Sequence, residues 1–350
     1  MIVVRTLKNR VKRSVRCLST SPKIPLIDFG RFHKNNSHDR EILAKEIDEA
    51  CTEIGFFAIV NHGVDDIVIS DAWAKTQEFF DLPAEKKLEA SPSMTSDYPY
   101  GYIPLGGEKL AAGRDAEVGR EDKATPPDLN ESFSVGPERT NSNDAPMRQW
   151  PIHDPAFIDA WTNYYASLET LSASLLETFA IALKLPSSKW FENKIDHHRC
   201  ALRALHYPHP KGEIPPGQLR ASAHTDYGSL TILLQDNAPG GLQVKASDER
   251  SGGWTPVPRE EGAFVINLGD LMARWTNDKW TSTLHRVVMP PPDAQGSTRR
   301  QSMAFFHNIN PDHIVECIET CQSPENPPKY EPIRAFDFLM KKHAAATGGS

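Results

Sequence analysis

The motif His224-Thr225-Asp226 combines two residue types that bind metal ions. The run from Leu230 to Leu234 is apolar or β-branched throughout and predicts a buried strand, with the motif at its entrance. Residues i and i+2 of an extended chain point to the same face, so the imidazole and the carboxylate would lie side by side. Two histidines and one carboxylate, with the remaining positions open, suit non-haem Fe(II) in oxygen chemistry. Taken alone, such a pair is more often a solvated strand edge, so the hypothesis needs a second histidine.

His285 is the candidate for that second histidine. It lies in a strand-like run, Thr283–Val288, where a hydrogen-bonded core histidine is the alternative interpretation. Turns predicted at Gly269-Asp270 and at Trp275-Thr276-Asn277 would bring this run back beside the first strand. The sequence therefore offers a complete set of three ligands.

Arg300 and Ser302 lie two residues apart on a further predicted strand, so they share one face of it. A guanidinium can donate two parallel hydrogen bonds to a carboxylate, and the serine hydroxyl adds a third donor. The pair could bind one end of a dicarboxylate whose other end reaches the metal. Without the histidine pair, Arg300 would be interpreted as a surface ion pair, worth at most ~1 kcal/mol.

The elements that must position these residues change in kind along the chain. Helical spacing of apolar residues predicts helices over Asp39–Ile54, Asp66–Phe80 and Pro155–Leu185, with a strand at Phe56–Val60. A return helix is expected near the C-terminus. Residues 90–146 are rich in glycine, proline and charge, which is typical of a functional loop. After Lys194, short strands with Gly/Pro turns predict a sandwich or barrel, closed as a jelly roll: Ala201–Tyr207, Leu230–Leu234, 240–244, Trp254–Val257, Ala263–Leu268, 283–288 and 300–308.

Composition is that of an ordinary globular chain. The 350 residues are 39% hydrophobic and 24% charged, enough for a sizeable core. The five cysteines are scattered and odd in number, which favours a reducing compartment over a disulfide framework. No run of 18 apolar residues occurs, so the sequence predicts no membrane insertion.

The N-terminus departs from this average. Seven basic residues precede the first acid, Asp28. Without them 32 basic residues remain against 46 acidic ones, so the net charge of −7 becomes −14 and a nucleic-acid partner is not expected. Val4, Leu7, Val11, Val15 and Leu18 form one apolar stripe on a helix, and the basic residues surround the rest. The pattern predicts a transit peptide over 1–22 and a mitochondrial address; a basic tail on a cytoplasmic protein, or import into a plastid, are the alternatives.

The order His-x-Asp, distal His and Arg-x-Ser resembles the Fe(II)- and 2-oxoglutarate-dependent dioxygenases, specifically the isopenicillin N synthase-like branch. The resemblance covers nearly the whole chain after Pro25 and includes Ile24–Phe29, Gly55–Val64 and Asn267-Leu268-Gly269-Asp270. It implies an α+β fold with a double-stranded β-helix (jelly-roll) core. The implied divisions are an N-terminal region at 24–137, a connecting helical segment at 138–198, the core at 199–310, and a return segment and tail at 311–350.

The resemblance also implies the site. Fe(II) would be bound by His224, Asp226 and His285, and the distal carboxylate of 2-oxoglutarate by Arg300 and Ser302. Tyr207 matches a tyrosine that relatives place near this cosubstrate. The neighbouring His206 stands where many plant relatives have asparagine, which leaves its role open. A pocket for a small-molecule substrate is expected from the 98–135 loop, including Tyr102 and Phe133, and from Phe306 with the chain after it.

The implied reaction uses O2 to oxidise an unactivated C–H bond, most simply by hydroxylation, and releases succinate and CO2. Desaturation and ring closure use the same site, and the motifs do not choose among these outcomes. An oxidase of the same fold that works without 2-oxoglutarate is one alternative, because isopenicillin N synthase itself retains Arg-x-Ser. A non-catalytic jelly-roll binding module is another. Substrate identity and oligomeric state lie beyond the sequence.

Overall fold

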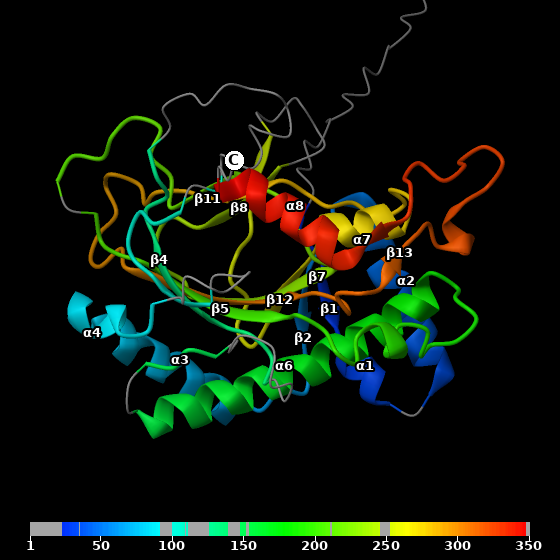
Figure 1. Cartoon of the computed structure of the whole chain (residues 1–350), viewed down its shortest axis with the longest axis horizontal. Helices are drawn as coiled ribbons and strands as arrows, with labels where there is room; N and C mark the ends of the chain where they lie inside the picture. The colour runs from blue at the N-terminus through cyan, green and yellow to red at the C-terminus, as the bar shows by residue number, and fades with distance from the viewer. Residues whose placement is uncertain are drawn as a thin grey trace, which may run out of the picture.

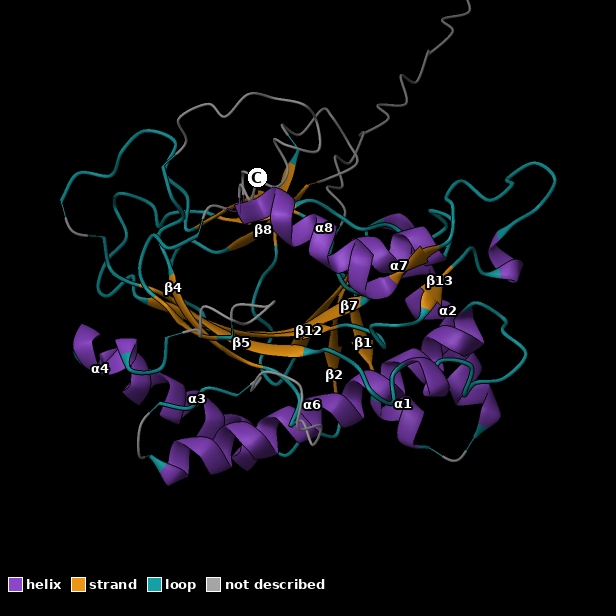
Figure 2. Cartoon of the chain, viewed as in Figure 1, coloured by secondary structure: helices purple, strands orange, loops and turns teal. Residues whose placement is uncertain are grey.

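The computed structural model describes residues 23–34, 36–91, 100–108, 110, 126–138, 148–151, 154–210, 212–245 and 253–347. The predicted transit peptide lies outside the described residues. Two β-sheets face each other across a central space, with helices on the outside (Figures 1 and 2). This is the α+β jelly-roll architecture that the sequence predicted. Within the described ranges, every helix is too short or too polar to cross a lipid bilayer.

The larger sheet has the strand order β1-β2-β10-β7-β12-β5-β4-β3. Its pairs are antiparallel except for β1 with β2, which is parallel. Strand β12 lies between β5 and β7, and this register sets Arg300 beside Tyr207 and Ser302 beside Gln235. The strands are β1 (Leu26–Asp28), β2 (Phe56–Val60), β3 (Gly101–Ile103), β4 (Glu131–Val135), β5 (Ala201–Tyr207), β7 (Leu230–Gln235), β10 (Phe264–Leu268) and β12 (Arg300–His307).

The smaller sheet has the order β6-β11-β8-β9, and all its pairs are antiparallel. Its strands are β6 (Ala221–His224), β8 (Leu242–Lys245), β9 (Trp254–Pro256) and β11 (His285–Val287). Because β6 and β11 are neighbours, His224 and His285 are direct partners in the register. A separate short pair joins β13 (Ile314–Val315) to β14 (Ile333–Arg334).

Helices cover the outer face of the larger sheet. Figure 1 shows α3 (Asp66–Asp81) and α6 (Pro155–Ala182) below this sheet, with α2 (Ser37–Glu53) against the other end of α6. Asp154 caps α6 by accepting from the backbone N–H of Phe157, and Pro155 at the first turn fits a helix start. The buried face of α6 carries Trp161, Tyr164, Tyr165 and Phe179, so these aromatic side chains are core packing. The shorter helices on this side are α1 (Gly30–His33) and α4 (Ala84–Leu88).

Two helices lie on the opposite side. Helix α7 (Asp270–Trp275) and the C-terminal α8 (Ala335–Thr347) lie on the side of the larger sheet away from α3 and α6 (Figure 2). The expected return helix is therefore present. The turn predicted at Gly269-Asp270 is instead the start of α7: Gly269 is its N-cap, and the backbone N–H of Ala273 donates to the Gly269 carbonyl.

Two further expectations are corrected. His224 does not open the strand that follows it: β6 ends at His224 and β7 begins at Leu230 in the other sheet. The His-x-Asp motif therefore lies at the crossover between sheets. The 90–146 stretch is also not one loop, because β3 and β4 within it extend the edge of the larger sheet. Serine and glycine in these strands weaken the apolar alternation that identifies a strand from sequence.

Candidate active site

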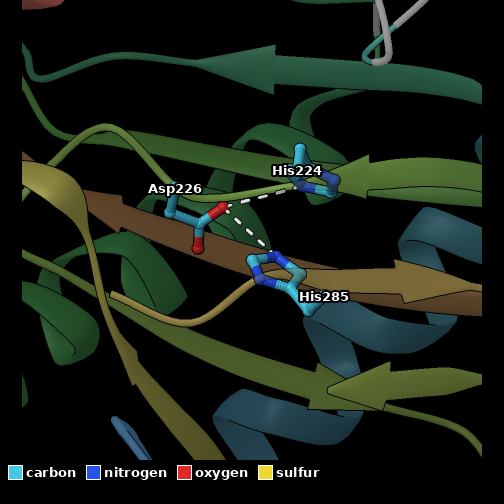
Figure 3. A group of neighbouring side chains, drawn as sticks. All are labelled: His224, Asp226 and His285. Atoms are coloured by element: carbon cyan, nitrogen blue, oxygen red, sulfur yellow. Dashed lines mark ion pairs between the residues drawn. The ribbon is translucent and has the colours of Figure 1, made fainter. Parts of the chain in front are cut away.

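His224, Asp226 and His285 converge at one end of the small sheet (Figure 3). The two rings lie 4.3 Å apart between centroids. Oδ1 of Asp226 is 3.8 Å from Nε2 of His224 and 3.5 Å from Nε2 of His285, and the three potential ligand atoms all lie within 4.8 Å of one another. Asp226 and His285 are buried and His224 nearly so. The three side chains could therefore hold one metal ion.

Both imidazoles are held in the orientation that metal binding requires. Nδ1 of His224 is 2.7 Å from the backbone carbonyl of Ser222, and Nδ1 of His285 is 3.0 Å from that of Thr283. A carbonyl can only accept, so each Nδ1 carries the proton and each Nε2 presents its lone pair to the shared space. In both cases the acceptor is two residues earlier on the same extended segment.

The carboxylate of Asp226 is held through its other oxygen. Oδ2 accepts from the Thr231 hydroxyl at 2.5 Å and from the Asn267 side-chain amide at 2.7 Å. Oδ1 is left to face the two imidazoles. Sequence reasoning missed both donors as site residues. Asn267 lay inside a stretch that carried the family resemblance, which was the one signal that could have singled it out.

The loop that carries Asp226 is held by hydrogen bonds to the first residue of α7. The backbone N–H of Asp270 donates to the Asp226 carbonyl at 2.8 Å, and the Thr225 hydroxyl donates to the Asp270 carboxylate at 3.0 Å. A Cβ at Gly269 would lie 2.2 Å from the Gly228 carbonyl oxygen. The loop and α7 can approach this closely only because position 269 has no side chain.

Burial and mutual charge set the protonation states of the triad. Burial, and then the neighbouring His285, lower the pKa of His224 to about 4. Burial alone would raise the pKa of Asp226, but the two histidines and Asn267 outweigh it and hold that pKa below its ordinary value. For His285 burial acts downward, and Asp226 outweighs it, so its pKa is raised. An ionised carboxylate between two imidazole nitrogens is a donor set that fits a divalent cation.

A second group of polar side chains lies on the facing sheet. The Arg300 side chain is 2% exposed, and its guanidinium donates to the Ser302 hydroxyl at 3.3 Å and to the Gln235 side-chain carbonyl at 3.0 Å. Its Cζ lies 4.8 Å from the centre of the Tyr207 ring. The structure thus brings together all three residues predicted for cosubstrate binding.

One cavity of about 510 Å³ joins the two groups. Arg300, Ser302 and Tyr207 line it together with His224, Asp226 and His285. Apolar side chains from both sheets complete the walls, and Phe306 is among the lining residues, as predicted. Leu339 and His343 from α8 also line it. A cavity of this size has room for two small organic molecules beside a metal ion.

Tyr102 and Phe133 were wrongly predicted to line this cavity. The Tyr102 hydroxyl donates to Glu131 instead, inside the protein, and the Phe133 ring packs on Phe79 and Trp161 in the core under the helices. Successive side chains of a strand point to opposite faces, and these two face the helical layer. His206 lies in the same buried cluster, with its Nδ1 2.7 Å from Glu131, and it is absent from the cavity lining.

Comparison with known proteins gives a consistent picture. Residues 24–157 match the family described as "non-haem dioxygenase in morphine synthesis N-terminal", and residues 198–309 match the "2OG-Fe(II) oxygenase superfamily". A 2-oxoglutarate-Fe(II) type oxidoreductase of Emericella nidulans, hxnY, is 31% identical and covers 93% of this chain and 90% of its own length.

Solved structures agree. A full-length Neurospora crassa protein, solved in complex with alpha-KG and thymine, is 33% identical with a TM-score of 0.79, and the match covers 92% of this chain and 96% of that one. JOX2, solved with 2OG, Fe and JA, is 27% identical with a TM-score of 0.71 over 95% of this chain and 89% of its own. Both similarities extend well beyond the site residues.

Proposed function

Because the chain belongs to the 2-oxoglutarate–Fe(II) oxygenase superfamily, we propose that its cavity hydroxylates an unactivated C–H bond of a small molecule. The protein is a 2-oxoglutarate-dependent dioxygenase, with Fe(II) as cofactor and with 2-oxoglutarate and O2 as cosubstrates. One observation supports the location of the reaction. The three potential metal ligands and Arg300 line a single cavity, although they come from different sheets.

We assign roles to individual side chains on this basis. Nε2 of His224, Nε2 of His285 and Oδ1 of Asp226 are the proposed iron ligands. Arg300 and Ser302 are the proposed donors to the distal carboxylate of 2-oxoglutarate, with Tyr207 packed beside them. When bound, iron and 2-oxoglutarate supply the oxidising equivalent, with release of succinate and CO2. The protein holds the reactants in place and limits the access of water.

The substrate is expected to occupy the part of the cavity on the α8 side. Leu339 and His343 lie there, and the ion pair between Glu108 and Arg203 adds a polar wall. Phe306 supplies an aromatic surface. Since one structural neighbour was solved with thymine, small nitrogen heterocycles form the first group of compounds to test.

The test is succinate formation by the purified protein with Fe(II), O2 and 2-oxoglutarate, with and without candidate substrates. His224→Ala, Asp226→Ala and His285→Ala should each abolish turnover and leave the circular dichroism spectrum largely unchanged, because the histidines lie at strand ends and Asp226 in the crossover between the sheets. Near-normal activity with bound iron in any of the three would refute the assignment. Oxidation of a substrate without 2-oxoglutarate would instead indicate an oxidase.

We also propose that residues 1–22 direct the protein into mitochondria. The support is the acid-free, arginine-rich amphipathic sequence, whose basic face suits import driven by a negative-inside potential. A fluorescent fusion of residues 1–30 should enter mitochondria, and reversing the charge at Arg10 and Arg13 should leave it in the cytosol. A fusion that is cytosolic from the outset would contradict the proposal. Entry into plastids would support a transit peptide but would contradict the mitochondrial destination.

A further inference from the structure

A second buried guanidinium lies near the cosubstrate end of the cavity. Arg220 immediately precedes β6 and its side chain is fully buried. Its Nη1 donates to the Pro239 carbonyl at 2.9 Å and its Nη2 to the Thr298 carbonyl, and both acceptors are neutral. Its Nε is buried and has no hydrogen-bond partner among the described residues. Arg220 is absent from the residues that line the cavity, so it does not contact a ligand there.

Arg220 and Arg300 lie on the same aromatic ring. Their Cζ atoms are 5.9 Å and 4.8 Å from the centre of the Tyr207 ring, so the two charges cannot be more than about 11 Å apart. Burial, and then the charge of Arg300, lower the pKa of Arg220 to about 10, which still leaves it charged at neutral pH. The Tyr207 ring is itself 2% exposed, so water screens this pair little.

Among the described residues, a single carboxylate acts on both of these cations, so their two positive charges are not balanced there. Asp236 is the carboxylate that acts on both, and its Oδ1 lies 4.0 Å from Nε of Arg300. It also accepts from the backbone N–H groups of Ala238 and Gln301, which divides its acceptor capacity. A buried charge without a counter-charge is costly, so a fold that keeps one is best explained by an anion that binds nearby.

We propose that Arg220 is a specificity-determining residue for the cosubstrate, whose charge favours a dianionic 2-oxo acid over a monoanionic one. The inference rests on the proposed binding of 2-oxoglutarate at Arg300. Arg300 supplies the hydrogen bonds, and Arg220 adds positive potential through the low-dielectric region around Tyr207. The effect is directed at the distal carboxylate, because that group is the one expected beside Arg300.

A purely structural role for Arg220 makes a different prediction. Its two hydrogen bonds tie the Pro239 loop to the Thr298 loop, and removing them would lower stability whatever ligand is bound. A field effect depends on charge and on the presence of the distal carboxylate. The two roles can therefore be separated by comparing two substitutions and two ligands.

The experiment measures dissociation constants by anaerobic calorimetry on the full chain loaded with Mn(II). The ligands are 2-oxoglutarate and 2-oxopentanoate, which has the same carbon chain without the distal carboxylate. Arg220→Gln should raise the dissociation constant for 2-oxoglutarate by about tenfold, the size expected if the distal carboxylate binds roughly 10 Å from the Arg220 guanidinium at an effective dielectric constant near 20. Binding of 2-oxopentanoate should change less than about twofold. Arg220→Lys, which keeps the charge, should retain most of the selectivity.

The proposal would be overturned if Arg220→Gln lost the same affinity for both acids. It would also be overturned if Arg220→Gln and Arg220→Lys raised the dissociation constant for 2-oxoglutarate equally. If Arg220→Gln fails to fold, Arg220→Met gives a second test, because it removes the charge and keeps a long side chain. That variant should lose the same preference for 2-oxoglutarate over 2-oxopentanoate, and an unchanged ratio would contradict the field effect. A wild-type protein that binds no 2-oxoglutarate would refute the proposed function itself.

Discussion

The side-chain amide of Asn267, near the end of strand β10, donates to Oδ2 of Asp226 over 2.7 Å. Together with the Thr231 hydroxyl it occupies the carboxylate oxygen that points away from the histidines. Asp226 can then present only Oδ1 toward Nε2 of His224 and His285. The geometry of the proposed metal site therefore depends on two residues that bind no metal.

Asn267→Ala and Thr231→Val should each weaken metal binding. Partners that orient a metal ligand typically contribute about ten- to hundredfold in metal affinity, and these two act on the same oxygen. The measurement is the Fe(II) or Co(II) dissociation constant of the purified variants. Thr231→Ser, which keeps the hydroxyl, should remain close to wild type.

Asn310→Ala is the matched control for these variants. Asn310 is as buried as Asn267, but its amide donates to Asp196 and Asn193, away from the cavity. This variant should lose stability and keep normal metal affinity. Unchanged metal affinity in both Asn267→Ala and Thr231→Val would show that Asp226 does not need to be held through Oδ2.

Arg300→Lys should weaken the binding of 2-oxoglutarate far more than the binding of iron. Lysine keeps the positive charge but loses the planar fork that can donate to both oxygens of a carboxylate. Charge-assisted hydrogen bonds contribute roughly 1.5–3 kcal/mol, so the apparent constant for 2-oxoglutarate should rise about ten- to hundredfold. Arg299→Lys is the control, since Arg299 precedes it in sequence but pairs with Asp81 on the surface. An unchanged constant for 2-oxoglutarate would contradict the assignment of Arg300 to its distal carboxylate.

Lys342 connects the C-terminal helix α8, through an ion pair with Asp270, to the loop that carries Asp226. Its Nζ lies 2.8 Å from Oδ2 of Asp270, the same oxygen that accepts from the Thr225 hydroxyl. Both side chains of the ion pair are about one-sixth exposed. Helix α8 lines the cavity through Leu339 and His343, so this ion pair holds a wall of the expected substrate site against the loop between the ligands.

Lys342→Met should therefore raise the KM for the substrate by about fivefold, corresponding to an ion pair worth roughly 1 kcal/mol. The metal dissociation constant should stay near the wild-type value, because Asp226 keeps its own partners. The adjacent Lys341, which is exposed, supplies the control Lys341→Met. If both lysine variants shift KM alike, the ion pair has no specific role in placing α8.

Glu131 should make stability depend on acid pH. Its carboxylate accepts from His206, Lys87 and Tyr102 inside the protein. Burial alone would raise the pKa of Glu131, but these partners outweigh it and lower the pKa from 4.5 to about 2. Because the pKa is lower in the folded state, the ionised carboxylate stabilises the fold at pH values above the pKa of the unfolded chain. That stabilisation is lost as the pH falls from about 4.5 to about 2.

Glu131→Gln should lower the free energy of unfolding by about 3 kcal/mol at pH 7, because Lys87 would be left buried without its counter-charge. The loss should shrink as the pH falls through the same window. Denaturant titrations between pH 3 and 7 measure both effects. Glu89→Gln breaks the exposed pair with Lys86 and should change stability by less than ~1 kcal/mol. Parallel pH curves for Glu131→Gln and wild type would contradict the lowered pKa.

The sequence by itself determined the elements with strong local patterns and the order of the chemical motifs. Strand Ala201–Tyr207 agrees with the structure at both ends, and the α6 prediction differs by three residues only at its C-terminal end. Apolar periodicity depends on whether each residue faces the core, which is a local property of the chain. The ligand and cosubstrate motifs were readable for a similar reason, since metal and carboxylate chemistry permits few residue types.

Only the tertiary structure decided which faces and which distant residues meet. Tyr102 and Phe133 turned toward the helices because strand alternation gives two faces without saying which one borders the cavity. Asn267 reaches Asp226, which lies 41 positions earlier in the sequence. Arg220, just before β6 of the smaller sheet, contacts the same Tyr207 ring as Arg300 of the larger sheet. Such contacts depend on strand pairing and sheet closure. No local pattern in the sequence records them, because the partners are set by the whole fold.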